Sequence, residues 1–314
     1  MATLEVFQDM TGRPDDAFLK ACTGLEGGGA ASGSTCGVVS GGVLSLACTA
    51  EPDLLSGGVA AERVAMEGAA QYVRWFADNY GSCLCRDRIG IDFYTKTGQM
   101  RYLLPGDKVL RCLVHIRGAM RYLHTNRFPR EPEDSDRETE PPGSEAPEPF
   151  HCARAVLEGV RQQTGIGNPR LERMAFVMDG GFAFSGGACG AMAGALMAVN
   201  LVLGLPIRQM TYRETVAGFV REHVNLLRKT PVDSLEPLAV GRKMLTDFRE
   251  IAGGIECRAI TGRLFSDWNT FQNYMAEAPQ CQGLIEAVIR RTSEEIRSLE
   301  KRLASRPGQS RRAF

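Results

Sequence analysis

The 314-residue chain has few aromatic side chains and no excess of charge of either sign. Aromatic residues make up 7% of it, and 37 Lys and Arg balance 37 Asp and Glu. Nucleic-acid binding draws on a basic field, and single-strand binding draws on aromatic rings that stack on bases. The composition therefore predicts that nucleic acid is not a partner.

Several motifs of known chemistries are missing as well. The chain contains no Walker loop and no H-E-x-x-H, and no cysteine pair is followed by His in the c-type haem pattern. Its first residues, MATLE, have neither the basic segment nor the apolar run of a secretory leader, and ten cysteines are too few for a disulfide scaffold of this length. We therefore expect a cytoplasmic protein with reduced thiols and no covalent haem.

What the sequence does contain is a Gly-rich turn that runs into Cys-Gly, and it occurs twice. Residues 179–199 read DGGFAFSGGACGAMAGALMAV, and residues 26–46 read EGGGAASGSTCGVVSGGVLSL. The two stretches align without a gap at a shift of 153 residues, and 155–165 match 2–12 at the same shift. This internal duplication predicts two copies of one structural unit.

The turn itself suggests a helix start that carries a reactive cysteine. Ser32 or Ser185 is a reasonable N-cap, which would place Cys36 or Cys189 in the first helical turn, where unsatisfied N–H groups and the helix dipole favour a thiolate. The G-x-x-x-G spacing that follows leaves one helix face open to close packing. The alternative is a buried helix whose cysteine only packs.

A second matched block carries more cysteines. Gly81, Cys85 and Arg86 correspond to Gly253, Cys257 and Arg258, and each block is followed by a further cysteine, Cys112 or Cys281. An arginine beside a cysteine is a charge that could lower the thiol pKa. Cys152 opens the second copy, and its counterpart would precede Met1. The first copy thus lacks one cysteine, for which Cys22, Cys48 or Cys83 could compensate.

Apolar residues at helical spacing predict helices elsewhere in both copies. One runs from Glu62 to Tyr80 and ends at Gly81, and residues 216–227 show the same pattern in the second copy, with His223 on the apolar face as a hydrogen-bonded core histidine. Leu226 to Val240 is expected to be an inserted loop or short extra helix, and an amphipathic helix begins at Cys281.

An acidic, Pro-rich segment around residues 129–149 separates the copies and has almost no apolar residue, so we expect a disordered linker. The predicted fold is all-α: two tandem helical-bundle repeats related by pseudo-twofold symmetry and joined by this linker. The expected divisions are a degenerate first repeat, the linker, the second repeat and a disordered tail, at 1–126, 127–150, 151–304 and 305–314.

Two stretches without charge, 27–50 and 180–207, are long enough to span a bilayer. Both open with a Gly-rich turn, contain polar residues and lack flanking aromatic or basic anchors. We therefore expect buried bundle helices and no membrane insertion.

The cysteine order resembles the four-cysteine redox-active family C_GCAxxG_C_C. The match consists of Cys152, the run from Gly180 to Gly194 around Cys189, then Gly253 with Cys257-Arg258, and Cys281. Residues 2 to about 120 resemble a degenerate copy. The resemblance implies a small helical module with an electron-transfer or thiol-redox role, and two fused copies imply a monomeric pseudodimer or a homodimer.

Two hypotheses follow for function. In the first, clustered cysteines either bind an iron-sulfur cluster or another soft metal as thiolates, or act without metal in thiol–disulfide exchange with a redox partner protein. The residues expected to be catalytic or metal-binding are Cys152, Cys189, Cys257 and Cys281; those expected to contact a cofactor are Gly180, Gly181, Gly186, Gly190, Cys36, Cys85 and Cys112. In the second, the chain is a non-catalytic helical binding or scaffold module with structural cysteines.

Overall fold

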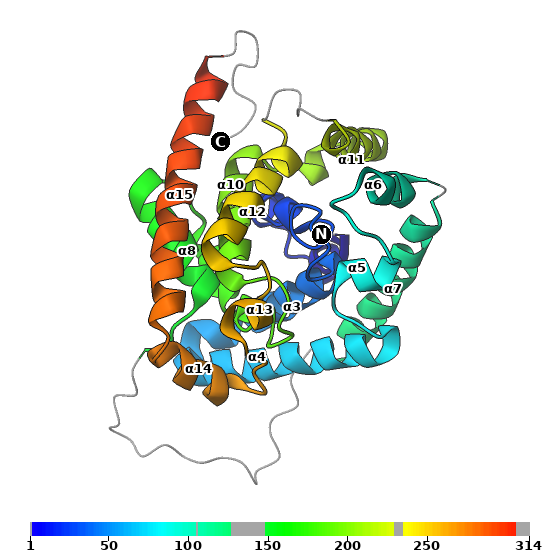
Figure 1. The fold of residues 1–314 in the computed structure, drawn as a ribbon. Coiled ribbons are helices and arrows are strands. Elements are labelled where there is room, and N and C mark those ends of the chain that lie inside the picture. The colour runs from blue at the N-terminus through cyan, green and yellow to red at the C-terminus, as the bar shows by residue number, and fades with distance from the viewer. Residues whose placement is uncertain (1, 105, 127–147, 229–234, 306–314) are drawn as a thin grey trace, which may run out of the picture.

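The structure is a computed structural model that describes residues 2–104, 106–126, 148–228 and 235–305. Over these residues the chain forms fifteen α-helices and short 3₁₀ turns. The described residues contain two isolated β-bridges and no longer strand. The all-α prediction is confirmed (Figure 1).

The first copy contains seven α-helices and one 3₁₀ turn. Their bounds are α1 Ala2–Thr11, α2 Asp16–Cys22, η1 Thr23–Leu25, α3 Gly37–Thr49, α4 Glu51–Tyr80, α5 Cys85–Ile89, α6 Lys96–Leu103 and α7 Asp107–Thr125.

The second copy repeats this order with one helix more. Its elements are α8 Cys152–Thr164, α9 Pro169–Met174, η3 Ala175–Met178, α10 Gly190–Leu203, η4 Ile207–Gln209, α11 Tyr212–Leu226, α12 Pro237–Ala252, α13 Cys257–Thr261, α14 Trp268–Ala276 and α15 Pro279–Ala304.

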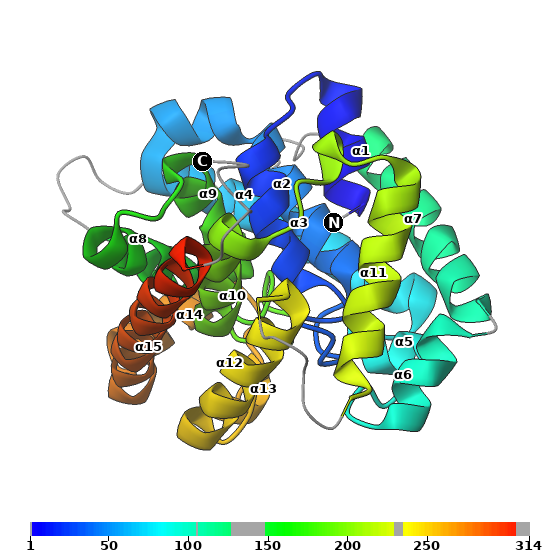
Figure 2. The same cartoon turned by 90° about the horizontal axis from the view of Figure 1, so that it is seen from above.

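The two copies share one core around helices α3 and α10. Within the copies, α10 packs on α8, α15 and α12, and α3 packs on α1, α7 and α4. Between them, α10 also packs on α2 and η1, while α3 packs on η3 and α9 (Figure 2). This reciprocal pattern fits the predicted pseudo-twofold arrangement and places the Gly-rich turns near the centre of the molecule.

Helix α10 is apolar on every side because it is enclosed on every side. All of its residues from Gly190 to Asn200 are buried. One described helical stretch, Gly190–Gln209, is long and apolar enough to cross a membrane, and 72% of its apolar window is buried inside the protein. Helices α3 and α4 would pass the same test as one broken span, but they meet at 93°.

The sequence analysis matched the helix that ends at Gly81 with the wrong helix of the second copy. That helix, α4, ends at Gly81 with φ +86°, and the second-copy helix that ends at the matching Gly253, φ +71°, is α12. Both turns need the left-handed backbone that glycine adopts without cost. The additional helix is α11, which contains residues 216–226, and α12 already begins at Pro237 within the expected insertion. Residues 127–147 of the predicted linker (127–150) and residues 306–314 of the predicted tail (305–314) lie outside the described residues.

Candidate functional site

Each Gly-rich turn folds as a short left-handed coil. Five consecutive residues, from Gly180 to Phe184, have φ between +46° and +82°, and the matching five, from Gly27 to Ala31, have φ between +42° and +86°. The N–H of Gly186 closes the second coil by donating to the carbonyl of Gly180 at 2.9 Å. Alanine and phenylalanine in this region cost roughly 1–2 kcal/mol each. Both copies keep this strained shape at the same positions, which marks the turn as a functional candidate.

The coil directs the chain into a backbone pairing that joins two cysteines. The Cys189 N–H donates to the Ile255 carbonyl at 2.9 Å, and the Cys257 N–H donates to the Gly187 carbonyl at 2.6 Å. In the first copy Cys36 and Cys85 are held by the equivalent bonds, to the carbonyls of Cys83 and Ser34 at 2.8 and 2.7 Å. Each copy therefore ties the start of its central helix to the start of a short helix.

The cysteines occupy the cap positions that were assigned to serine. Cys36 and Cys189 are the N-caps of α3 and α10. The hydroxyls of Ser32 and Ser185 instead bond back to the carbonyls of Gly28 and Gly181 inside the coil. The coil uses the seryl hydroxyls for its own closure, which leaves the cysteine sulfur at the helix end.

Four cysteines of the second copy line one small cavity. Each lies at the N-terminal end of a different helix: Cys152 opens α8, Cys189 caps α10, Cys257 opens α13 and Cys281 is the third residue of α15. The cavity measures about 20 Å³, room for about one water molecule, and its other walls include Gly180, Gly190, Phe271, Met275 and Leu284. The structure thus brings together all four residues expected to form the site.

Two glycines of the G-x-x-x-G pattern allow this convergence. A methyl group at Gly190 would lie 3.2 Å from the Cβ of Cys152, and one at Gly194 would lie 2.8 Å from the carbonyl oxygen of Ala153. Glycine at both positions lets α8 approach α10 closely. The predicted close-packing face is confirmed in this copy.

Burial keeps the thiols of this cavity protonated at neutral pH. Burial raises the pKa of Cys189 to about 11, although the N–H groups of Met192 and Ala191 lower it. Burial also raises the pKa of Cys152 and Cys257 well above the ordinary value, and that of Cys281 as well. The effect of the helix N-termini is outweighed, so these cysteines need a proton acceptor before they can react.

The geometry does not fit a preformed metal site. Among the residues that the structure describes, no group of three or more His, Cys, Asp or Glu side chains is arranged to hold a metal ion. The predicted metal role of Cys152, Cys189, Cys257 and Cys281 thus lacks geometric support.

The first copy also brings together its three matching cysteines, but one of them, Cys36, has a lowered pKa. A hydrogen bond from Cys85, opposed by burial and helped by the N–H groups of Val38 and Val39, lowers the pKa of Cys36 to about 7. The same contact raises the pKa of Cys85, and burial raises that of Cys112 to about 11. The copy with the degenerate sequence therefore holds the more acidic thiol.

Three further cysteines had been considered as replacements for the missing first cysteine. Cys22 and Cys48 are buried in α2 and α3, where burial raises their pKa, that of Cys48 to about 12. Cys83 is half-buried and its thiol donates to the Val73 carbonyl at 3.6 Å. Cys22 and Cys48 influence each other, but among the described residues no interaction links either of them to Cys36, Cys85 or Cys112. Cys83 is closer, because the charge of Cys36 adds to burial in raising its pKa to about 12.

Sequence reasoning missed an acid–histidine contact beside each Gly-rich turn. His151 bonds to Asp179, and His223 bonds to Glu26 at 3.1 Å and to Gln99 at 2.9 Å. His223 is thus the hydrogen-bonded core histidine that was expected. Asp179 and Glu26 are matched positions of the duplication, each directly before its Gly-rich turn. An acid retained there in both copies was the available signal.

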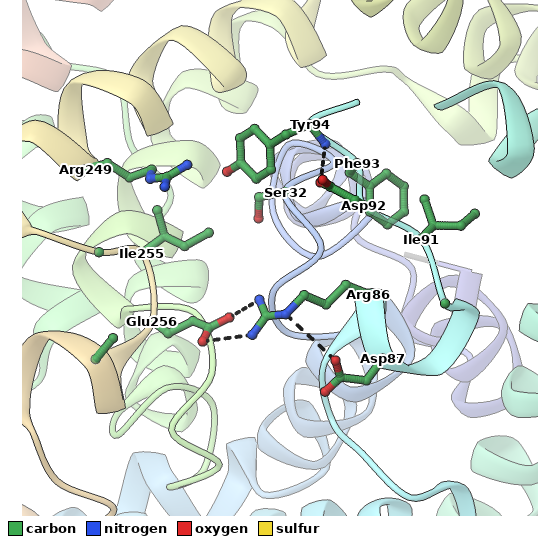
Figure 3. Close-up of a pocket in the computed structure, with 13 residues that line it drawn as sticks. Ser32, Arg86, Asp87, Ile91, Asp92, Phe93, Tyr94, Arg249, Ile255 and Glu256 are labelled. Atoms are coloured by element: carbon green, nitrogen blue, oxygen red, sulfur yellow. Dashed lines mark hydrogen bonds and ion pairs between the residues drawn. The ribbon is translucent and has the colours of Figure 1, made fainter. Parts of the chain in front are cut away.

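A cleft of about 520 Å³ lies where the copies meet (Figure 3). Arg86, which follows Cys85, pairs there with Glu256, which precedes Cys257. Arg249 lies over the Tyr94 ring, 5.2 Å from its centre. The arginine beside Cys85 therefore bridges the two copies, whereas it had been expected to lower a thiol pKa.

A family model described as "Putative redox-active protein (C_GCAxxG_C_C)" matches residues 1–125 and 150–295. The two matched segments coincide with the two copies seen in the structure. No curated protein and no solved structure matches the chain.

Proposed function

The chain belongs to the C_GCAxxG_C_C family of redox-active proteins, and from this premise we propose that its four-cysteine cavity performs reversible thiol–disulfide exchange. The observation that carries the proposal is the convergence of Cys152, Cys189, Cys257 and Cys281 on one cavity of about 20 Å³. Thiols that converge on one small space can react with one another.

Cys189 and Cys257 are the proposed reacting pair. Their segments are held together by backbone hydrogen bonds. Their first-copy counterparts, Cys36 and Cys85, are joined by a thiol–thiol hydrogen bond. Two thiols that interact in one copy support a disulfide at the same position in the other.

The reaction needs a partner that carries a disulfide. A thiolate of the pair attacks one partner sulfur, forms a mixed disulfide and releases the first partner thiolate. The second cysteine then attacks the mixed disulfide, which forms the cavity disulfide and releases the second partner thiolate. Two electrons pass to the partner, and the two protons lost by the cavity thiols end on the two partner thiolates. We place this exchange with a redox partner protein in the cytoplasm.

Disulfide mapping tests the proposal. The protein, purified without oxygen, is titrated with defined ratios of reduced and oxidised dithiothreitol, quenched with a labelled alkylating agent and digested for mass spectrometry. We expect two cavity thiols to be lost and regained reversibly, and Cys189→Ser to abolish the transition. Cys48→Ser, which changes a buried cysteine outside the cavity, is the matched control. Four thiols that stay free at every ratio would overturn the proposal.

The cleft between the copies favours a second candidate, the binding module. Its about 520 Å³ and its exposed arginine and tyrosine side chains suit a small polar ligand or a partner segment. Partner capture that is unchanged in Cys189→Ser but lost in Arg249→Ala would favour this candidate over the thiol chemistry.

A further inference from the structure

His151 bridges two carboxylates that come from different copies. Its Nδ1 is 2.7 Å from Asp179 Oδ2, and its Nε2 is 2.9 Å from Glu62 Oε2 in helix α4. The side chain of His151 is 1% exposed and that of Asp179 0%, whereas that of Glu62 is 14% exposed. The three side chains form a hydrogen-bonded chain from the core toward the surface.

The inner end of this chain adjoins the four-cysteine cavity. Asp179 directly precedes Gly180, which lines the cavity, and its Oδ1 accepts the N–H of Cys152 at 3.0 Å. After burial, the charge of Asp179 is a further cause that raises the pKa of Cys152, Cys189 and Cys257. One carboxylate is therefore close to three of the four thiols.

The outer end is held by a third charged group. Arg154 of α8 forms an ion pair with Glu62 and also donates to the carbonyl of Arg173. The rings of Phe176 and Trp268 pack on His151, with centroids 6.0 and 5.6 Å away. The charged groups that face the imidazole are thus Asp179, Glu62 and Arg154, and the remaining contacts shown are apolar.

This arrangement meets a requirement of thiol chemistry in a buried cavity. The thiols are protonated at neutral pH, and a cavity with room for about one water molecule offers little solvent to accept their protons. Burial alone would lower the pKa of His151, but its two carboxylate partners outweigh burial and raise it. The imidazole can therefore hold a proton in transit despite its burial.

Building on the proposed thiol exchange, we propose that Asp179, His151 and Glu62 form a proton relay between the cavity and the surface. With its proton on Nε2, His151 receives at Nδ1 the proton that Asp179 takes from a thiol, while the Nε2 proton passes to Glu62 and then to water. Each disulfide formed sends out two protons, which are taken up by the two thiolates released from the partner. Reduction reverses the path.

A second buried histidine, His223 of α11, supplies a matched control for this relay. His223 is 0% exposed and hydrogen-bonded through both ring nitrogens, as His151 is, but its partners are Gln99 and Glu26. Replacing His223 removes a comparable buried contact and leaves the second-copy cavity untouched. It separates loss of proton transfer from loss of packing.

Alkylation by iodoacetamide tests the relay without requiring a disulfide. Each thiol forms a thioether and releases one proton and one iodide ion, and mass spectrometry gives the rate at Cys152, Cys189 and Cys257 between pH 6 and 10. We expect His151→Gln and Glu62→Gln to slow these rates at pH 7 by tenfold or more, since positioned proton acceptors contribute about 10²- to 10⁴-fold. The loss should shrink toward pH 10, where hydroxide replaces the relay.

His223→Gln should leave these rates and their pH profile unchanged. Glu62→Gln, at the more exposed end, keeps the test decisive if His151→Gln fails to fold. Profiles identical to wild type in folded His151→Gln or Glu62→Gln would overturn the relay. If the variants are alkylated more slowly but the wild-type protein never forms a disulfide, the relay is sustained and the proposed exchange is overturned.

Discussion

At the residue scale, the two copies shift the pKa of the matched cap cysteines in opposite directions. Cys36 and Cys189 are both N-caps of a buried helix, yet the pKa of Cys36 is lowered to about 7 and that of Cys189 is raised to about 11. The leading cause in the first copy is a hydrogen bond from the Cys85 thiol, and in the second copy it is burial. One thiol donor therefore decides the charge of the cap cysteine.

Removing that donor should make Cys36 less reactive. In Cys85→Ala the hydrogen bond is lost while burial remains, so the pKa of Cys36 should rise and its alkylation midpoint should move to higher pH. Site-resolved mass spectrometry after alkylation measures the midpoint. Cys112→Ala removes a neighbouring thiol that does not lower the Cys36 pKa and serves as the control. An unchanged midpoint in Cys85→Ala would show that the thiol contact does not set the charge.

Glu222 gives a prediction for stability. Burial and the charges of Glu26 and Glu236, opposed by Arg221, raise the pKa of this carboxyl from 4.5 to about 8, and its Oε1 has no hydrogen-bond partner among the described residues. Because the folded state binds this proton more tightly than the unfolded state, the contribution of Glu222 to stability is complete below pH 4.5. It is lost at about 1.4 kcal/mol per unit as the pH rises to 8.

Glu222→Gln should remove this loss. Urea unfolding between pH 5 and 9 should show that the variant gains stability over wild type with rising pH and levels off above pH 8. Glu286→Gln, an exposed change in α15, should run parallel to wild type. A constant difference between Glu222→Gln and wild type would contradict the raised pKa.

At the element scale, the site depends on how closely two helices approach. Cys152 reaches Cys189 because Gly190 and Gly194 let α8 lie against α10. The cysteines sit on helix ends, so a shift of α8 along or away from α10 changes the distance between two sulfurs directly. The packing of this helix pair is therefore part of the site.

A methyl group at Gly194 should separate the two helices. It would lie 2.8 Å from the Ala153 carbonyl oxygen, so we expect Gly194→Ala to cost about 1–3 kcal/mol. Gly283 in α15 has nothing within 4 Å of the same position, and Gly283→Ala should gain about 1 kcal/mol from helix propensity. Equal stability of the two variants, measured by denaturant unfolding, would refute the close approach.

The sequence predicted most of these elements and missed what joins them. Spacing was enough to place the helices that end at Gly81 and begin near Cys36, Cys189 and Cys281. The cap position of Cys189 was missed because Ser185 is a better cap by propensity, but the left-handed coil ties up its hydroxyl. The Glu62–His151 contact was missed because it joins residues far apart in sequence, which no local period reveals.

At the scale of the whole molecule, the two copies complete one another. Helix α10 of the second copy is covered partly by α2 and η1 of the first, and the relay to the second-copy cavity starts at Glu62 in the first. Arg170 of α9 further pairs with Asp15 and Glu51. The duplicated chain thus builds internally an arrangement that a single copy would form only with a partner.

Two separate chains, 1–126 and 148–314, should therefore stay together when they are produced in the same cell. Size-exclusion chromatography with light scattering should give one complex near the full mass of 34.2 kDa, less the omitted residues. The second half alone exposes the apolar surface of α10 and should self-associate or precipitate. Halves that elute as independent monomers would contradict a shared core.

The proposed function requires that four cysteines act as thiols, and one measurement tests that directly. Protein purified without oxygen is analysed for iron, zinc and acid-labile sulfide, and its thiols are counted by mass before and after oxidation. We predict protein without a stoichiometric metal, with Cys152, Cys189, Cys257 and Cys281 free when reduced and two fewer thiols among them when oxidised. Stoichiometric iron and sulfide that disappear in Cys189→Ser would contradict the account and replace thiol exchange with cluster chemistry.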